Sequence, residues 1–188
     1  MNKERILEAA AQVIRQKGFH ATSMQDIAEA VNLQKASVYH HISSKQEILL
    51  ALLDQALELL TARLEMVIKQ DIPTDKKLHQ AIRCYLEALA ENGDLVSVLL
   101  LEYRSLEPAY LVRHIPRRDR FERLWRKLIQ EGMDTGCFCA TDPALTARAL
   151  LGVLNWTITW YKLSGPLSVD QIADHVAGLF LNGLLCRQ

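Results

Sequence analysis

Proline and glycine are scarce in this sequence, with five and eight residues among 188. Because these two residues interrupt helices most often, their scarcity permits long uninterrupted helices. It also excludes the collagen-like and the proline-rich or glycine-rich low-complexity classes, and no repeat of fixed period is present. Hydrophobic residues make up 49% and charged residues 23% of the chain, which is ordinary globular usage and argues against global disorder. The length makes one domain, or one domain with a small appendage, the starting expectation.

An excess of charge of one sign is also missing, because 22 Lys and Arg residues balance 22 Asp and Glu residues. No overall field therefore draws the protein to nucleic acid or to a membrane surface, and any such binding must come from a local patch. The four cysteines form no C-x-x-C pair, and the segment Cys137-x-Cys139 has no histidine nearby. We expect free thiols, no metal site and no cofactor.

Long hydrophobic runs are absent. The most apolar stretch, 149–161, is short of the roughly 20 residues that a membrane-spanning helix needs, so we expect no membrane span. The N-terminal stretch MNKERILEAAAQVIRQKG mixes charges with helical spacing and has no unbroken apolar segment. We therefore expect no signal peptide and a cytoplasmic protein.

Recognisable catalytic motifs are lacking as well. The sequence has no nucleophile elbow, no glycine loop for phosphate and no H-E-x-x-H, and its six histidines are scattered. We therefore expect that the protein is not an enzyme.

Apolar residues recur at intervals of three and four almost everywhere, which is typical of consecutive amphipathic helices. The pattern predicts an all-α protein of about nine helices. The expected ranges are 3–17, a short helix capped by Thr22 or Ser23, 34–41, 45–69, 75–91, 94–106, 116–134, 143–163 and 169–186. Gly18 is placed to end the first helix, and Asn32 is placed to form a left-handed turn.

The short helices near the start include two that are joined by a turn of three to four residues, the geometry that places a second helix in the major groove of DNA. The residues sharpen this expectation. They are Gly18-Phe19, Thr22-Ser23, Asp26-Ile27-Ala28, Val31-Asn32-Leu33, Ala36-Ser37-Val38-Tyr39-His40-His41 and Ser44-Lys45-Gln46-Glu47. In this order and spacing they resemble the N-terminal domain of the tetracycline-repressor (TetR) family of bacterial transcriptional regulators, over about the first 50 residues. Asn32 stands where the family usually has glycine and Ile42 where it usually has an aromatic residue, and both fit the same roles.

The resemblance implies that nine residues contact DNA, at base edges or at the phosphate backbone. They are Ser23, Gln25, Lys35, Ala36, Ser37, Tyr39, His40, His41 and Lys45. The chemistry agrees, because lysine bonds guanine, glutamine bonds adenine and alanine packs on the thymine methyl group, while hydroxyls and Lys45 suit phosphate. Residue type alone equally allows Tyr39 to be a core aromatic, Gln25 a capping residue and Lys35 a solvated side chain. No acidic residue lies between Gln34 and Lys45, so the expected DNA face is locally basic.

The rest of the chain matches the family only in architecture, and the resemblance implies that it dimerises and binds a small effector. We therefore expect a DNA-binding domain at 1–47 and a ligand-binding and dimerisation domain at 48–188. The last two helices are apolar and carry Gly152, Gly178 and Gly183, which permit close approach and favour a dimer interface over an ordinary core pair. The expected interface residues are Leu151, Leu154, Ile158, Val176, Leu179, Phe180 and Leu184.

The middle helices predict an apolar effector pocket, although the same spacing is typical of simple core packing. The residues expected to contact the ligand are Tyr85, Leu89, Leu100, Tyr103, Arg117, Arg120, Trp125, Trp156 and Trp160. The basic segment 113–127 fits a solvated helix face. Alternatively it is an anion site at the mouth of the pocket, which would suit an acyl-coenzyme A thioester or a fatty acid.

The expected function is a repressor that binds a palindromic operator in double-stranded DNA as a homodimer and is released by a largely apolar small molecule. The alternative is a DNA-binding dimer that has no small effector and is regulated by a protein partner. An open cavity would favour the first hypothesis, and a fully packed interior would favour the second.

Overall fold

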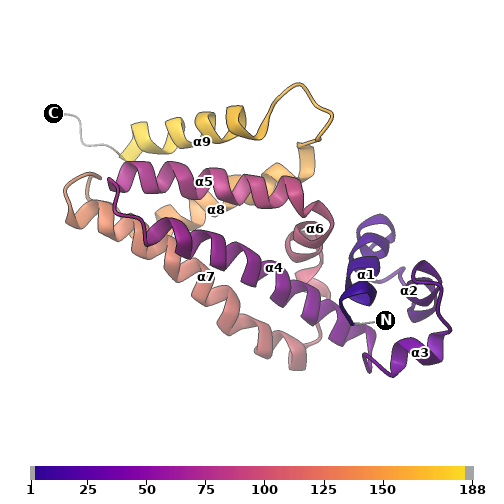
Figure 1. Cartoon of the computed structure of the whole chain (residues 1–188). Coiled ribbons are helices and arrows are strands. Elements are labelled where there is room, and N and C mark those ends of the chain that lie inside the picture. The colour runs from indigo at the N-terminus through magenta and orange to yellow at the C-terminus, as the bar shows by residue number, and fades with distance from the viewer. Residues whose placement is uncertain (1–2, 185–188) are drawn as a thin grey trace. The chain divides into compact units, whose positions relative to one another are not determined.

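The computed structural model describes residues 3–184, and this part of the chain forms nine α-helices, one short 3-10 helix and no β-strand (Figure 1). The predicted all-α fold is therefore confirmed. The helices are α1 (Lys3–Lys17), α2 (Met24–Ala30), α3 (Lys35–Tyr39), α4 (Lys45–Ile68), α5 (Thr74–Glu91), α6 (Gly93–Glu102), the 3-10 helix η1 (Tyr103–Ser105), α7 (Pro108–Asp134), α8 (Pro143–Trp160) and α9 (Val169–Leu184). Among these helices, none is long and apolar enough to cross a membrane.

The chain divides into two compact units. The first holds the residues up to Glu58 together with Asn92–Arg118, and the second holds Leu59–Glu91 together with the residues from Asp119 onward. Helices α4 and α7 each have residues in both units. The predicted boundary after residue 47 separates functions rather than compact units, and it stays a prediction.

Local sequence signals set the helix ends near the start of the chain. The Ser23 hydroxyl accepts the Asp26 N–H (3.1 Å), and the Asp26 carboxylate accepts the Ser23 N–H (2.7 Å), which is the capping box that begins α2. Asn32 has a φ of 55° and so forms the predicted left-handed turn. Gly18, with a φ of 80°, follows the last residue of α1.

Helix α7 corrects one prediction. The sequence predicts a start at Pro116, but the helix begins at Pro108 and contains Pro116 in its interior. A proline there cannot donate to the carbonyl four residues earlier, which belongs to Val112. The part of α7 before Pro116 is held by a tertiary contact, since His114 is 2% exposed and lies 3.0 Å from Asp54. Because most helical stability in proteins comes from such packing, the helix continues through the proline. Two predicted ends were also too late, since α6 ends at Glu102 and α8 at Trp160.

In the first unit, α1 packs against α2 and α6, and α2 packs against α3 (Figure 1). The buried side chains include Ile6, Ala10, Ile14, Ile27, Val38, Ile48, Leu52 and Leu53. Polar contacts connect residues 92–118 to this core. Arg15 pairs with Asp94 at 2.6 Å, and the Gln46 amide donates to the Ser105 carbonyl (3.0 Å) and accepts the Glu107 N–H (3.1 Å). The connection between α6 and α7 is therefore fastened to the first turn of α4.

In the second unit, α5 packs against α9 and α8 (Figure 1). The side chains buried there include Leu78, Ile82, Leu86, Leu150, Leu154, Ile172 and Val176. On the surface, His79 lies 2.8 Å from Asp174 and Arg83 lies 3.0 Å from Asp170, so two pairs join α5 to α9. Between α7 and α8 the buried ring of Phe138 lies directly on Gly132, where it leaves no room for a Cβ atom.

Candidate nucleic-acid interface and ligand-binding core

The short helix α3 is anchored on one face and open to solvent on the other. Val38 is fully buried, whereas Lys35 and Ala36 are exposed and Tyr39 is 45% exposed. The Lys35 ammonium lies 6.0 Å from the centre of the Tyr39 ring. Tyr39 is therefore not a core aromatic, and α3 presents side chains that can bond or pack against base edges.

Two histidines extend this surface beyond the end of α3. His40 and His41 are exposed, and Ser37 is half-buried within the helix. Because no carboxylate occurs between Gln34 and Lys45, no acidic side chain of this segment opposes the approach of phosphate. The local basic character expected from the sequence thus lies on an exposed segment.

Ser23 and Gln25 are exposed at the start of α2, but both also bond within the chain. The Ser23 hydroxyl donates to Asp26 (2.6 Å), and hydrogen bonds from Lys17 and Ser23 hold the pKa of Asp26 well below its ordinary value. The Gln25 amide donates to Glu29 at 2.9 Å. Ser23 is therefore the capping residue, and a contact of the Gln25 amide N–H groups with adenine competes with the bond to Glu29.

Lys45 is engaged with the protein itself. Its ammonium donates to the carbonyls of Thr22 (2.7 Å) and Phe19 (2.8 Å) and lies 3.5 Å from that of His20. It also lies 4.4 Å from the centre of the Phe19 ring. Since an ammonium has three N–H donors, these contacts use its hydrogen-bonding capacity, and Lys45 fastens the connection between α1 and α2.

The sequence carries no signal for this arrangement, because the acceptors are backbone carbonyls that every residue has. Of the nine residues predicted to contact DNA, seven are exposed, and Ser37 and Lys45 are half-buried. All nine lie in the first unit. Their contacts with DNA stay predictions, and a phosphate contact by Lys45 requires the exchange of at least one of its present bonds.

Three aromatic rings pack together in the core of the second unit. Tyr85 lies 6.4 Å from both Phe121 and Trp125, whose ring centres are 6.3 Å apart. The Tyr85 hydroxyl donates to Asn155 at 2.5 Å, and burial raises the pKa of Tyr85 above its ordinary range. Trp125 is 1% exposed, and its indole nitrogen has no hydrogen-bond partner among the residues that the structure describes. Sequence reasoning missed Phe121 and Asn155. An isolated polar residue in an apolar helix, such as Asn155, has no distinctive spacing.

The other apolar residues predicted to contact a ligand lie in different surroundings. Leu89 is buried beside a void too narrow for a water molecule. The void is lined by Leu86, Leu89, Thr157, Tyr161, Val169 and Ile172. Leu100 and Tyr103 belong to the first unit and are half-buried. Trp156 and Trp160 are 66% and 45% exposed on α8, so both are available to a partner outside the protomer.

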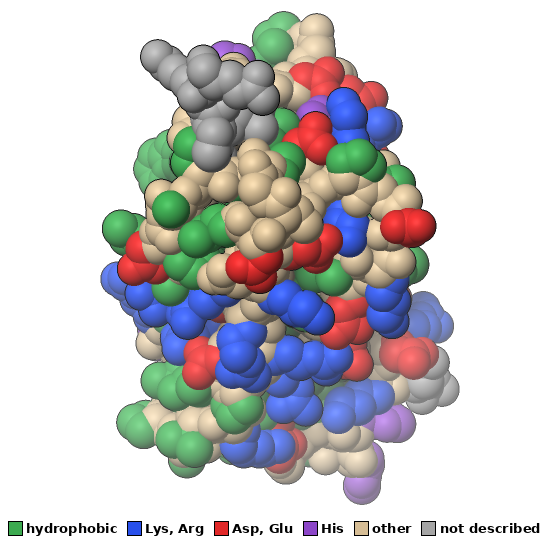
Figure 2. Space-filling model, turned by 90° about the vertical axis from the view of Figure 1, so that its left-hand side faces the viewer, with side chains coloured by type: hydrophobic (Ala, Val, Ile, Leu, Met, Phe, Trp, Pro, Cys, Tyr) green, Lys and Arg blue, Asp and Glu red, His purple; other side chains and the backbone are tan. Residues whose placement is uncertain are grey.

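The basic segment 113–127 is paired with carboxylates at several points. Arg117 lies 3.4 Å from Asp54, and Arg120 lies 2.7 Å from Glu65, while the two arginine side chains are 56% and 60% exposed. On the face of the molecule drawn in Figure 2, Lys and Arg side chains gather with Asp and Glu side chains among them. These pairs support the interpretation as a solvated face, and a role of Arg117 and Arg120 in ligand binding stays a prediction.

One basic residue of the segment 113–127 is buried. His114 is 2% exposed, and its Nδ1 lies 3.0 Å from Asp54. Further along α7, Glu122 accepts hydrogen bonds from Arg126 and from Arg148 on α8. The segment therefore also holds helices together, which charge patterning alone does not reveal.

The last two helices expose a different set of apolar residues from the one predicted for dimerisation. Leu154 and Val176 are buried within the protomer, and Leu179 is 61% exposed. Leu151, Ile158 and Phe180 are half-buried, and the side chain of Leu184 lies outside the described residues. Val153, Trp156 and Trp160 add exposed apolar surface on α8. Gly152, Gly178 and Gly183 have no heavy atom within 4 Å of where a Cβ would stand, so nothing in the described part of the protomer fills the space beside them.

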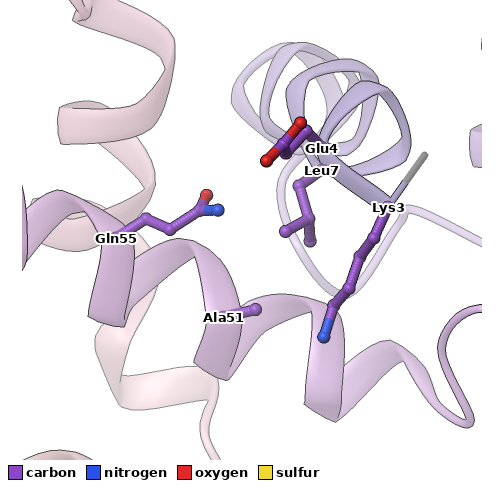
Figure 3. A pocket seen from close by; sticks show the side chains of 5 residues that line it. All are labelled: Lys3, Glu4, Leu7, Ala51 and Gln55. Atoms are coloured by element: carbon purple, nitrogen blue, oxygen red, sulfur yellow. The ribbon is translucent and has the colours of Figure 1, made fainter.

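An open pocket of about 330 Å³ lies in the first unit between α1 and α4. Figure 3 shows Lys3, Glu4 and Leu7 of α1 across from Ala51 and Gln55 of α4. The volume is at the low end for ligand sites. Two of the five lining side chains are apolar, Leu7 and Ala51, and three are polar or charged.

Two family models match most of the chain. The model described as bacterial regulatory proteins, tetR family, matches residues 6–52, and the model described as tetracyclin repressor-like, C-terminal domain, matches residues 71–184. The first match contains α2, α3 and the start of α4, which carry the candidate nucleic-acid interface. The second contains the aromatic cluster and both terminal helices.

Individual relatives agree with these matches over nearly the whole chain. The HTH-type transcriptional repressor KstR2 of Mycolicibacterium smegmatis is 26% identical over 188 residues, which cover 99% of this chain and 92% of the relative. The crystal structure of the TetR-family regulator PfmR from Thermus thermophilus is 36% identical, with a TM-score of 0.88 and coverage of 95% and 97%. AibR, in a crystal structure with isovaleryl coenzyme A and operator DNA, is 28% identical, with a TM-score of 0.86 and coverage of 94% and 96%.

Proposed function

Because the chain belongs to the tetR family of bacterial regulatory proteins, we propose that it is a ligand-responsive transcriptional repressor. It binds a palindromic operator as a homodimer and leaves the operator when a largely apolar small molecule binds. The observation that carries this proposal is the helix α3, which is anchored by the buried Val38 and exposes Lys35, Ala36 and Tyr39 on a segment without acidic residues.

Helix α3 enters the major groove, and each exposed side chain has a partner of fitting chemistry. Lys35 bonds guanine O6 or N7, Ala36 packs against a thymine methyl group, and Tyr39 and His40 contact base edges or phosphates. Hydroxyl and basic side chains around the groove contact the phosphate backbone of the DNA. These are Ser23, Ser37, His41 and Lys45, and Gln25 reaches an adenine from α2.

The homodimer forms through α8 and α9. The exposed Val153, Trp156 and Trp160 on α8 supply the apolar surface, and Leu179 supplies it on α9. The open space beside Gly152 allows a second copy to approach closely. Two-fold symmetry of the protein then requires two operator half-sites separated by one helical turn of DNA or a multiple of it.

The effector binds in the second unit at the cluster of Tyr85, Phe121 and Trp125. A buried aromatic cluster suits an apolar molecule, and the similarity to AibR, whose structure contains isovaleryl coenzyme A, favours acyl-coenzyme A thioesters and fatty acids as first candidates. An anionic end of such a molecule would pair with Arg120, which lies in the same unit and must then release Glu65.

Helix α4 carries the response, because it begins at the Lys45 end of the DNA-binding region and continues into the second unit. A ligand that tilts α4 changes the spacing of the paired α3 helices. An effector that favours the DNA-incompetent state by about 3 kcal/mol weakens operator binding on the order of 100-fold. Reciprocity then requires operator DNA to weaken effector binding by the same factor.

A second candidate function is a DNA-binding dimer without a small effector, in which the second unit only dimerises or binds a protein partner. The observation that favours it is the void beside Leu89, which has no room for a water molecule. The observation that favours an effector is the unpartnered indole N–H of Trp125, because buried donors are almost always satisfied.

The test selects DNA from a random pool with the chain of 188 residues and measures affinity for the selected site by fluorescence anisotropy. Palindromic sites and a dimer in light scattering are expected, and a monomer at micromolar concentration would contradict the proposal. Thermal-shift screening of acyl thioesters, fatty acids and neutral aromatics then separates the two candidates. Stabilisation by the first two groups with release of DNA supports the ligand-responsive repressor, whereas no response to any compound supports the alternative.

A further inference from the structure

The indole nitrogen of Trp125 is the one buried side-chain donor without a partner among the residues that the structure describes. The side chain is 1% exposed, so bulk water does not reach the N–H group. A buried donor that bonds neither protein nor solvent destabilises the folded chain. Such a donor is informative because folded proteins rarely retain one without a reason.

The neighbours of Trp125 do not supply a good acceptor. Phe121 and Tyr85 lie 6.3 Å and 6.4 Å away in edge-to-face arrangements, with interplanar angles of 87° and 67°. A ring face is at most a weak acceptor for an N–H group. The one hydroxyl in the cluster, that of Tyr85, donates to Asn155 at 2.5 Å. The donor of Tyr85 is therefore satisfied within the protein, while that of Trp125 is not.

From this contrast we infer that the effector carries an uncharged hydrogen-bond acceptor, such as a carbonyl oxygen, within its apolar part, and that Trp125 Nε1–H donates to it. This inference rests on the proposed function and deepens it. The acceptor is uncharged because Tyr85, Phe121 and Trp125 are each at most 6% exposed and bring no cation to balance an anion. Because the three rings are buried and pack against one another, a ligand that reaches Trp125 must separate packed side chains.

The resulting site distinguishes ligands by whether they carry a hydrogen-bond acceptor as well as by the length of their acyl chain. An acyl thioester has a carbonyl one bond from its sulfur, whereas a hydrocarbon chain has no acceptor. A site that hydrogen-bonds a substrate group rejects an analogue lacking it far more strongly than an apolar pocket rejects a changed chain length. Trp125 is thus assigned as a specificity-determining residue.

The experiment compares each acyl thioester with the thioether in which two hydrogens replace the carbonyl oxygen. The probes are butyryl, octanoyl and palmitoyl coenzyme A and their S-alkyl counterparts, and affinity is measured by calorimetry on the full-length protein. We expect the thioester of at least one length to bind about 10- to 100-fold more tightly than its thioether. In Trp125→Phe this ratio falls to near one. Phe121→Leu is the control: it weakens both probes alike and keeps the ratio.

A spectroscopic readout on the wild-type protein covers the case in which Trp125→Phe does not fold. The chain has three tryptophans, so the indole region of a ¹H–¹⁵N correlation spectrum holds three signals. Their assignment comes from Trp156→Phe and Trp160→Phe, which leave the Trp125 signal in place. We expect that signal to move downfield with the thioester and not with the thioether.

The outcomes separate this inference from the function on which it rests. Equal binding of thioester and thioether, a ratio that persists in Trp125→Phe, or a Trp125 signal that the thioester does not move would overturn the inference alone. If none of the probes binds or releases DNA, the proposed effector class fails, and the role of Trp125 fails with it.

Discussion

Lys45 offers the sharpest test of how the first unit is built. Replacing it with methionine keeps the aliphatic stem and removes the ammonium, which bonds the carbonyls of Thr22 and Phe19 at 2.7 Å and 2.8 Å and lies over the Phe19 ring. A hydrogen bond to a charged group contributes about 1.5–3 kcal/mol, and an exposed cation–π contact about 0.5–1 kcal/mol. Because Lys45 is half-exposed and water replaces part of these contacts, we expect Lys45→Met to lower the free energy of unfolding by about 2 kcal/mol.

The assay is urea denaturation followed by circular dichroism, at one protein concentration and without DNA. Lys35→Met is the matched control, because Lys35 is exposed on α3 and its ammonium should change stability by less than about 0.5 kcal/mol. A different result would refute the reasoning. If Lys45→Met leaves stability unchanged and instead lowers the salt slope of operator binding by about 0.9, the Lys45 ammonium serves phosphate and not the carbonyls.

Three further outcomes are expected. Gly132→Ala should destabilise the protein by about 1–3 kcal/mol in thermal denaturation, because its Cβ has no room beside Phe138, whereas Gly152→Ala, with open space around it, should not destabilise the protomer. Asp26→Asn should lower the free energy of unfolding at neutral pH. The pKa of Asp26 is lowered in the folded state, so the ionised carboxylate stabilises the fold above pH 3.8 and this contribution is lost as the pH falls below that value. A stability difference between variant and wild type that grows on acidification would contradict this expectation. Trp156→Glu should give a folded monomer in light scattering, because it places a charge on the exposed apolar face of α8.

The regular elements were largely predictable because their signals are local. The recurrence of apolar side chains at helical spacing predicted the helices, and Ser23, Asp26 and Asn32 act within a few residues of where they stand. The one wrong start, at Pro116, has a tertiary cause. A proline is tolerated inside α7 because the part of the helix before it is held by tertiary packing, in which the buried His114 lies beside Asp54. Such packing cannot be read from the sequence.

Part of the candidate site could likewise be predicted from local sequence signals, and part depended on the tertiary structure. The order and spacing of the residues from Gly18 to Glu47 by themselves indicated the family, and helix spacing placed Lys35, Ala36 and Tyr39 near one another on the helix predicted to contact DNA. Only the tertiary structure decided that the Lys45 ammonium bonds backbone carbonyls, that Trp125 holds a buried N–H without a partner, and that Leu154 faces the core while Trp156 faces solvent. The physical reason is that periodicity reports which face of a helix is apolar, whereas the partner of a buried polar atom depends on groups distant in the chain that folding brings within hydrogen-bond distance.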